Sequence, residues 1–160
     1  MATIGVISDT HGLLRPEVRA HLAGCGRIIH AGDLDNRETL QRVTCLGEAT
    51  VVRGNCDQGP WAQGLPDFEL VTVEGITICV VHALESLPLD PRAAGASAVV
   101  FGHTHVPHNE SRDGILYFNP GSAGPGRYGK PIALGKLHID ATSIRGEIIT
   151  LPCAAGLRGH

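Results

Sequence analysis

Short apolar runs recur along the chain, and each is followed by glycine and polar residues. Three runs rich in Val and Ile have the length of strands and fall at residues 2–7, 27–31 and 49–53. Between them, Pro16 suits the first turn of a helix that ends near Gly24, and Asn36 can cap a second helix. This β-α-β-α-β order predicts parallel strands joined by crossover helices.

The second half of the chain reads mostly as strands. Residues 68–73 and 76–81 flank Glu74-Gly75, a hairpin turn, and residues 98–101 form a buried run. We expect an antiparallel final part, with strands at 115–119, 132–139 and 144–151. Residues 58–66 and 84–95 read as loops, the second with one short helix. The pattern predicts a single α/β domain over residues 1–160, because no repeat or linker divides it.

Composition and charge limit the kinds of function that the chain can have. Aromatic residues make up only 4% of the chain, so the core must be aliphatic. The net charge is −3 and no run of basic residues exceeds two, which argues against a nucleic-acid polymer or a membrane surface as partner. Five scattered cysteines do not suggest a disulfide framework, and the first residues read as a strand rather than a signal peptide. We therefore expect a cytoplasmic protein.

Residues able to bind metal follow the strand-like runs. They are Asp9, His11, Asp33, Asn55, His82, His103 and His105. Ligands of open α/β sheets sit outside the carboxyl ends of the strands, so these side chains should converge on one crevice. Their number is too large for one catalytic ion and fits two divalent ions that share a carboxylate, about 3.5–4 Å apart. The mixed nitrogen and oxygen set suits Mn²⁺, which we expect, as well as Ni²⁺, Fe²⁺ or Zn²⁺.

The order of these motifs resembles the calcineurin-like metallophosphoesterase superfamily, and within it the small YfcE-type phosphodiesterases. The resemblance is carried by Asp9-x-His11, Gly32-Asp33, Gly54-Asn55-Cys56-Asp57, His82, Gly102-His103-x-His105 and Asn119-Pro120-Gly121-Ser122. It implies a four-layer α/β/β/α sandwich of two mixed sheets flanked by helices. It also implies in-line attack on small phosphodiesters, and on some monoesters, by a hydroxide that bridges the two metals.

The resemblance also implies a division of roles. Asp9, His11 and His105 would hold one ion, Asn55, His82 and His103 the other, and Asp33 would bridge both. Asp33, Asn55 and His103 would be the catalytic members. Larger relatives carry His where this chain has Cys56, which puts protonation of the leaving group in question and favours esters with good leaving groups.

Other residues and functions are left open by the sequence. Cys56, Arg53 and Arg127 are candidates for contact with the substrate; the two arginines could hold its phosphate, although a surface or structural role would account for either. The alternative function is a non-catalytic scaffold of the same fold that binds protein. A dedicated nuclease ranks behind both, because the chain lacks a basic channel. A homodimer is compatible with the sequence, and nothing in it decides the point.

Overall fold

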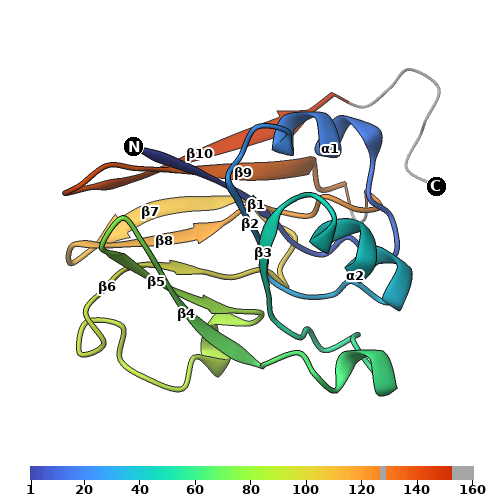
Figure 1. The fold of residues 1–160 in the computed structure, drawn as a ribbon, viewed down its shortest axis with the longest axis horizontal. Helices are drawn as coiled ribbons and strands as arrows, with labels where there is room; N and C mark the ends of the chain where they lie inside the picture. The colour runs from blue at the N-terminus through green and yellow to red at the C-terminus, as the bar shows by residue number, and fades with distance from the viewer. Residues whose placement is uncertain (127–128, 153–160) are drawn as a thin grey trace.

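The computed structural model describes residues 1–126 and 129–152 as two five-stranded sheets packed face to face (Figure 1). The strand order is β10-β9-β1-β2-β3 in the first sheet and β4-β5-β6-β8-β7 in the second. Both sheets contain parallel and antiparallel pairs. The predicted sandwich of two mixed sheets is therefore confirmed.

The first sheet is built around the predicted β-α-β-α-β unit. Its parallel strands are β1 (Ala2–Ile7), β2 (Arg27–His30) and β3 (Glu48–Val51), joined by α1 (Pro16–Leu22) and α2 (Arg37–Thr44). The side chain of Asn36 accepts a hydrogen bond of 2.9 Å from the amide of Thr39, so it caps α2 as expected. The hairpin of β9 (Ile132–Ile139) and β10 (Ile144–Leu151) completes the sheet antiparallel to β1.

The second sheet differs from the prediction at one edge. Its strands are β4 (Phe68–Val73), β5 (Ile76–Val81), β6 (Ala96–Val100), β7 (His108–Arg112) and β8 (Ile115–Asn119). The β4–β5 hairpin is confirmed. Strand β7 was not predicted, because its residues are almost all polar and exposed. We expected β8 in an antiparallel arrangement, but it pairs parallel with β6 and antiparallel with β7.

Apolar side chains, most of them aliphatic, form three core layers. Between the sheets lie residues such as Val6, Val80 and Phe118, and between the first sheet and the two α-helices lie others such as Ile7 and Val18. The outer face of the second sheet is covered by the 3₁₀ turn η2 (Leu84–Ser86) and the loop after it. Within the described residues, α-helices therefore cover only one side of the sandwich; the remaining 3₁₀ turn is η1 (Pro60–Ala62).

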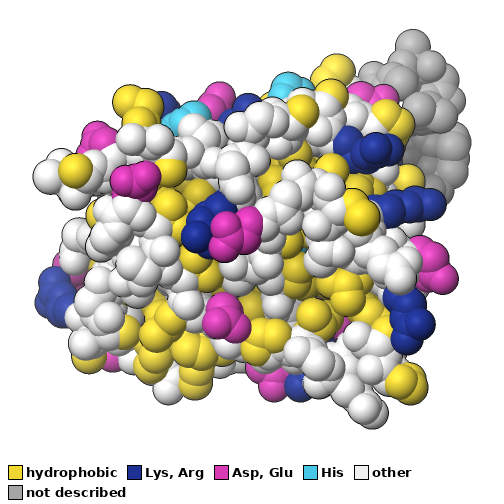
Figure 2. Space-filling model, viewed as in Figure 1, with side chains coloured by type: hydrophobic (Ala, Val, Ile, Leu, Met, Phe, Trp, Pro, Cys, Tyr) yellow, Lys and Arg dark blue, Asp and Glu magenta, His cyan; other side chains and the backbone are white. Residues whose placement is uncertain are grey.

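The surface view agrees with the weak net charge. On the face drawn in Figure 2, Lys and Arg side chains are interspersed with Asp and Glu among apolar groups. No helix in the described ranges has the length and apolar character needed to cross a membrane.

Candidate metal centre

Loops from both sheets meet at the carboxyl ends of their parallel strands. The amide of Asp9 donates to the Gly32 carbonyl at 2.9 Å, and the amide of Gly102 donates to the His82 carbonyl at 2.8 Å. A Cβ atom at Gly54 would lie 2.1 Å from Asp33 Oδ1, and one at Gly102 would lie 2.0 Å from Ser8 Oγ. Glycine is required at both positions because the loops approach too closely for any side chain.

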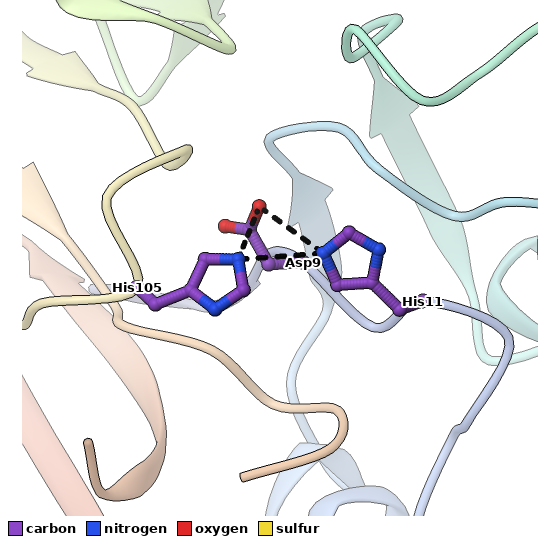
Figure 3. Close-up of side chains that lie close together, drawn as sticks. All are labelled: Asp9, His11 and His105. Carbon is purple, nitrogen blue, oxygen red and sulfur yellow. Dashed lines mark hydrogen bonds and ion pairs between the residues drawn. The ribbon is translucent and has the colours of Figure 1, made fainter. Parts of the chain in front are cut away.

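The first half of the site joins three of the predicted ligands from both sheets (Figure 3). Nε2 of His105 lies 3.4 Å from Asp9 Oδ1, and Nε2 of His11 lies 3.9 Å from the same oxygen. The two Nε2 atoms are 3.3 Å apart. One carboxylate oxygen and two ring nitrogens thus face a common point, an arrangement that can hold a metal ion.

The second half lies beside it. Asn55 Oδ1 is 3.0 Å from His82 Nε2 and 3.1 Å from His103 Nδ1. Asp33 Oδ2 is 3.3 Å from His82 Nε2 and 3.8 Å from His11 Nε2, so this carboxylate lies between the two halves. The structure therefore brings together all seven residues that the sequence singled out.

Hydrogen bonds at the far side of two rings fix which nitrogen faces the site. Nδ1 of His82 donates to the Ala31 carbonyl at 2.7 Å, and Nδ1 of His11 lies 3.1 Å from Asp35 Oδ1. A ring that uses Nδ1 as donor in its neutral form presents the lone pair of Nε2. These are the outer partners that orient histidine ligands in metal sites.

Asp9 provides the strongest sign that the residues fit metal ions. Its Oδ2 accepts from Ser8 Oγ at 2.7 Å and from the His103 amide at 3.1 Å. Its Oδ1 is buried and has no hydrogen-bond partner among the described residues. A buried carboxylate oxygen without a hydrogen-bond partner is costly, and here it faces the Nε2 atoms of His11 and His105. A divalent cation would satisfy all of these atoms together.

The electrostatics favour positive charge at the same place. Burial raises the pKa of Asp33, but hydrogen bonds from His82 and the Cys56 amide outweigh this and bring it to about 2. Burial likewise opposes ionisation of Asp9, yet His105, Ser8 and His82 hold its pKa below the usual value. Burial lowers the pKa of His82, and Asp33 overcomes that effect and raises it. The site therefore holds two ionised carboxylates and attracts cations.

Backbone strain is concentrated on the same residues. Five of the seven predicted ligands have φ between 45° and 74°, in the left-handed region: Asp9, His11, Asp33, His103 and His105. Such conformations cost about 1–3 kcal/mol each in residues other than glycine and persist where function or the surrounding structure requires them. The strain aims these side chains at the common site instead of along the strands.

Asp57 holds the loops of the site in place, a role that the sequence did not reveal. Its side chain is buried and accepts four backbone N–H bonds from the loops that carry Asp33 and Asn55. It touches no predicted ligand side chain within the described contacts. Its place two residues after Asn55 is the only sequence signal that could have suggested this role.

His30, at the end of β2, is buried and supports the same loops. Its Nδ1 accepts from the Gly32 amide at 3.1 Å, and its Nε2 lies 2.9 Å from Thr10 Oγ1. Burial lowers its pKa to about 4, against the pull of nearby carboxylates. A neutral His30 thus fixes the turn that presents Asp33.

The three candidate substrate residues fall in different places. Cys56 lies beside the ligands, where burial and the Asp33 carboxylate raise the pKa of its thiol to about 11. Arg53 lines a cleft of about 1010 Å³ next to Asn55, His82 and His103, with its guanidinium 2.7 Å from Asp67 Oδ1. Arg127 lies outside the described residues.

Comparison with known proteins agrees with these features. The family model of the calcineurin-like phosphoesterase superfamily domain matches residues 2–142. YsnB of Bacillus subtilis, named a probable metallophosphoesterase, is 34% identical over 128 residues, which cover 73% of this chain and 72% of that protein.

Solved structures share the fold. YfcE, described as a phosphoesterase from Escherichia coli, matches with a TM-score of 0.67 and 26% identity over 86% of this chain and 89% of its own. Vps29 of Entamoeba histolytica, solved with Zn²⁺, matches with a TM-score of 0.73 and 22% identity over 92% of this chain and 98% of its own, a likeness of fold alone. With the family model spanning most of its length, this chain belongs to the calcineurin-like phosphoesterase superfamily.

Proposed function

We propose that this protein is a dinuclear metal-dependent phosphoesterase that hydrolyses small phosphodiesters and some monoesters. The observation that carries the proposal is the convergence of seven nitrogen- and oxygen-bearing side chains at one site, where Oδ1 of Asp9 is buried without a hydrogen-bond partner among the described residues. Relatives named metallophosphoesterase and phosphodiesterase support the same class of chemistry.

In this proposal the ligands divide between two ions. Asp9, His11 and His105 hold the first, and Asn55, His82 and His103 hold the second. Asp33, whose Oδ2 lies within 3.8 Å of a ring nitrogen in each half, is shared between them. The bound ions would supply Lewis-acid chemistry by lowering the pKa of a water molecule and offsetting charge on the phosphoryl oxygens. Mn²⁺ is the expected ion, although this ligand set also accepts Zn²⁺, Fe²⁺ or Ni²⁺.

The chain's own residues would then orient the substrate. The cleft of about 1010 Å³ adjoins Asn55, His82 and His103, so it offers space for one ester arm beside the second ion. The Cys56 thiol keeps its proton at neutral pH because its pKa is raised to about 11. So weak an acid gives little help to a poor leaving group, and we therefore expect a preference for esters whose leaving groups are stable anions.

The test is hydrolysis of bis-p-nitrophenyl phosphate and p-nitrophenyl phosphate by metal-stripped protein, with Mn²⁺, Ni²⁺, Zn²⁺ or Mg²⁺ added singly. We expect restored turnover, greater on the diester. Asp33→Asn should abolish it without loss of the fold, whereas Asp113→Asn, in the exposed β7–β8 turn, should match the wild type. Unchanged turnover in Asp33→Asn would refute the metal mechanism. Folded, metal-loaded protein without any turnover would instead favour the scaffold function.

A further inference from the structure

The imidazole ring of His11 has a second nitrogen that the metal centre does not use. Its Nε2 lies 3.3 Å from Nε2 of His105, whereas its Nδ1 is on the opposite side of the ring (Figure 3). There Nδ1 lies 3.1 Å from Oδ1 and 3.3 Å from Oδ2 of Asp35. Cys56 completes an outer group with these two residues, in which one ligand atom of each lies within 4.8 Å of the others. The ring of His11 therefore separates two groups of side chains that can bind metal.

Backbone hydrogen bonds hold all three residues of the outer group in place. The amide of His11 donates to the Asp33 carbonyl at 3.0 Å, and the amide of Cys56 donates to Asp33 Oδ1 at 2.9 Å. The amide of Asp35 donates to Asp57 Oδ1 at 2.9 Å. The side chains of Asp35 and Cys56 are exposed, so they can close around an ion without movement of their loops.

The outer group offers a different set of ligand atoms from the metal centre. The seven predicted ligands of the centre provide nitrogen and oxygen, whereas Cys56 adds sulfur. Thiolate ligands select soft ions such as Zn²⁺ and Cd²⁺, while Mn²⁺ and Mg²⁺ favour oxygen. One imidazole, one carboxylate and one thiolate, with water in the fourth position, form a ligand set that suits Zn²⁺. The two negative charges of that set would balance a divalent ion.

We propose that Nδ1 of His11, Asp35 and Cys56 bind a thiophilic divalent cation such as Zn²⁺, and that this ion inhibits the enzyme by taking His11 from the metal centre. The Cys56 thiol releases its proton to solvent as its sulfur binds the ion. The ion also replaces the proton on Nδ1, and a neutral imidazole then carries its proton on Nε2. An Nε2–H group has no lone pair for the first ion of the centre. The inhibition rests on the proposed function, because it takes His11 to be a ligand of that ion, whereas the binding does not.

The first experiment detects the sulfur ligand and needs no turnover. Cd²⁺ is added to metal-free protein, and the charge-transfer absorption between thiolate and metal is followed in the near ultraviolet. The wild type should show absorption that saturates, and Cys56→Ser should lose it. Cys45→Ser, which removes another exposed thiol, is the matched control and should keep it. Asp35→Asn should need at least about tenfold more Cd²⁺ for the same absorption. Absorption that is absent from the wild type, or retained in Cys56→Ser, would overturn the proposed site.

The second experiment tests the inhibition. Mn²⁺-loaded wild type and Cys56→Ser hydrolyse bis-p-nitrophenyl phosphate while Zn²⁺ is added, and each rate is divided by that of the same protein without Zn²⁺. Half-inhibition of Cys56→Ser should need at least about tenfold more Zn²⁺ than half-inhibition of the wild type. Equal sensitivity would mean that Zn²⁺ acts by replacing Mn²⁺ in the metal centre, and it would overturn the inhibition.

The two experiments also separate this site from the proposed function. Cd²⁺ absorption that depends on Cys56, in a protein that hydrolyses no ester with any metal, would refute the proposed function and leave the outer site standing. Ester hydrolysis restored by Mn²⁺, without any Cd²⁺ absorption, would overturn the outer site and leave the proposed function standing.

Discussion

The carboxylate of Asp57 should be the most sensitive structural residue behind the metal centre. Its Oδ2 accepts from the amides of Asp33 at 2.9 Å and Gly54 at 2.8 Å. Its Oδ1 accepts from the amides of Leu34 at 2.8 Å and Asp35 at 2.9 Å. One carboxylate thus joins the two loops that supply Asp33 and Asn55, and the residue is only 4% exposed.

Replacing Asp57 with Asn removes half of these four hydrogen bonds. An amide group has one acceptor oxygen, so two of the four backbone N–H groups lose their partner and face an NH₂ group instead. Each lost bond to a charged acceptor costs about 1.5–3 kcal/mol, which gives about 3–6 kcal/mol for the pair. That is a large fraction of the roughly 5–15 kcal/mol that stabilises a domain. Affinity for metal should fall as well, because both loops are released.

The assay is urea unfolding of the metal-free proteins, followed by calorimetric titration of the folded variant with Mn²⁺. Asp67→Asn is the matched control, because its side chain is 75% exposed and its ion pair with Arg53 lies on the surface. We expect this control to lose less than about 1 kcal/mol. The role assigned to Asp57 would be refuted by two results together. These are a free energy of unfolding of Asp57→Asn within about 1 kcal/mol of the wild-type value and an unchanged affinity for Mn²⁺.

Four further predictions follow from the site. Because the pKa of His30 is about 4 in the fold and about 6.5 in the unfolded chain, the unfolded state binds the proton first as the pH falls. His30 should therefore contribute a loss of about 3 kcal/mol of stability to the metal-free protein between pH 6.5 and pH 4. Urea unfolding curves of His30→Gln should show a correspondingly smaller loss of stability over this range than those of the wild type. Gly54→Ala should weaken Mn²⁺ binding in calorimetry, since its Cβ would lie 2.1 Å from Asp33 Oδ1, whereas Gly64→Ala, with open space around it, should not. Free Mn²⁺ at a concentration a hundred times its dissociation constant should raise the free energy of unfolding by about 2.7 kcal/mol in thermal unfolding. Removal of the Mn²⁺ by a chelator should reverse this gain. The rate of aryl phosphodiester hydrolysis should fall steeply as the pKa of the leaving phenol rises, because the Cys56 thiol is a poor acid; a flat dependence, with chemistry rate-limiting, would contradict that view of Cys56.

The positions of the candidate ligands could be predicted because strand ends are fixed by simple patterns. Apolar runs of four to six residues mark the buried strands, and the carboxyl ends of parallel strands meet at one edge. Asp9 and Asp33 follow two such strands in the first sheet, and His82 and His103 follow two in the second. The convergence of these four residues therefore needed no knowledge of the loops.

Features that depend on tertiary contacts were not predictable in the same way. Strand β7 has no apolar alternation, and only the Asp113-Gly114 turn after it indicates a hairpin. Asp57 and Asp35 act through backbone amides and ring nitrogens of distant loops, which no local pattern records. Among the described residues no α-helix covers the second sheet, although the family resemblance implied one; residues 84–95, predicted as a loop with one short helix, cover that face instead.

The central claim is that the seven ligands hold two metal ions and that both are needed for phosphoester hydrolysis. The most direct test is titration of metal-free protein with Mn²⁺ under tight-binding conditions, with bound metal and hydrolysis of bis-p-nitrophenyl phosphate measured on the same samples. We predict that binding saturates at two equivalents and that turnover appears mainly with the second. Saturation at one equivalent with full activity, or two bound equivalents without any hydrolysis, would contradict it.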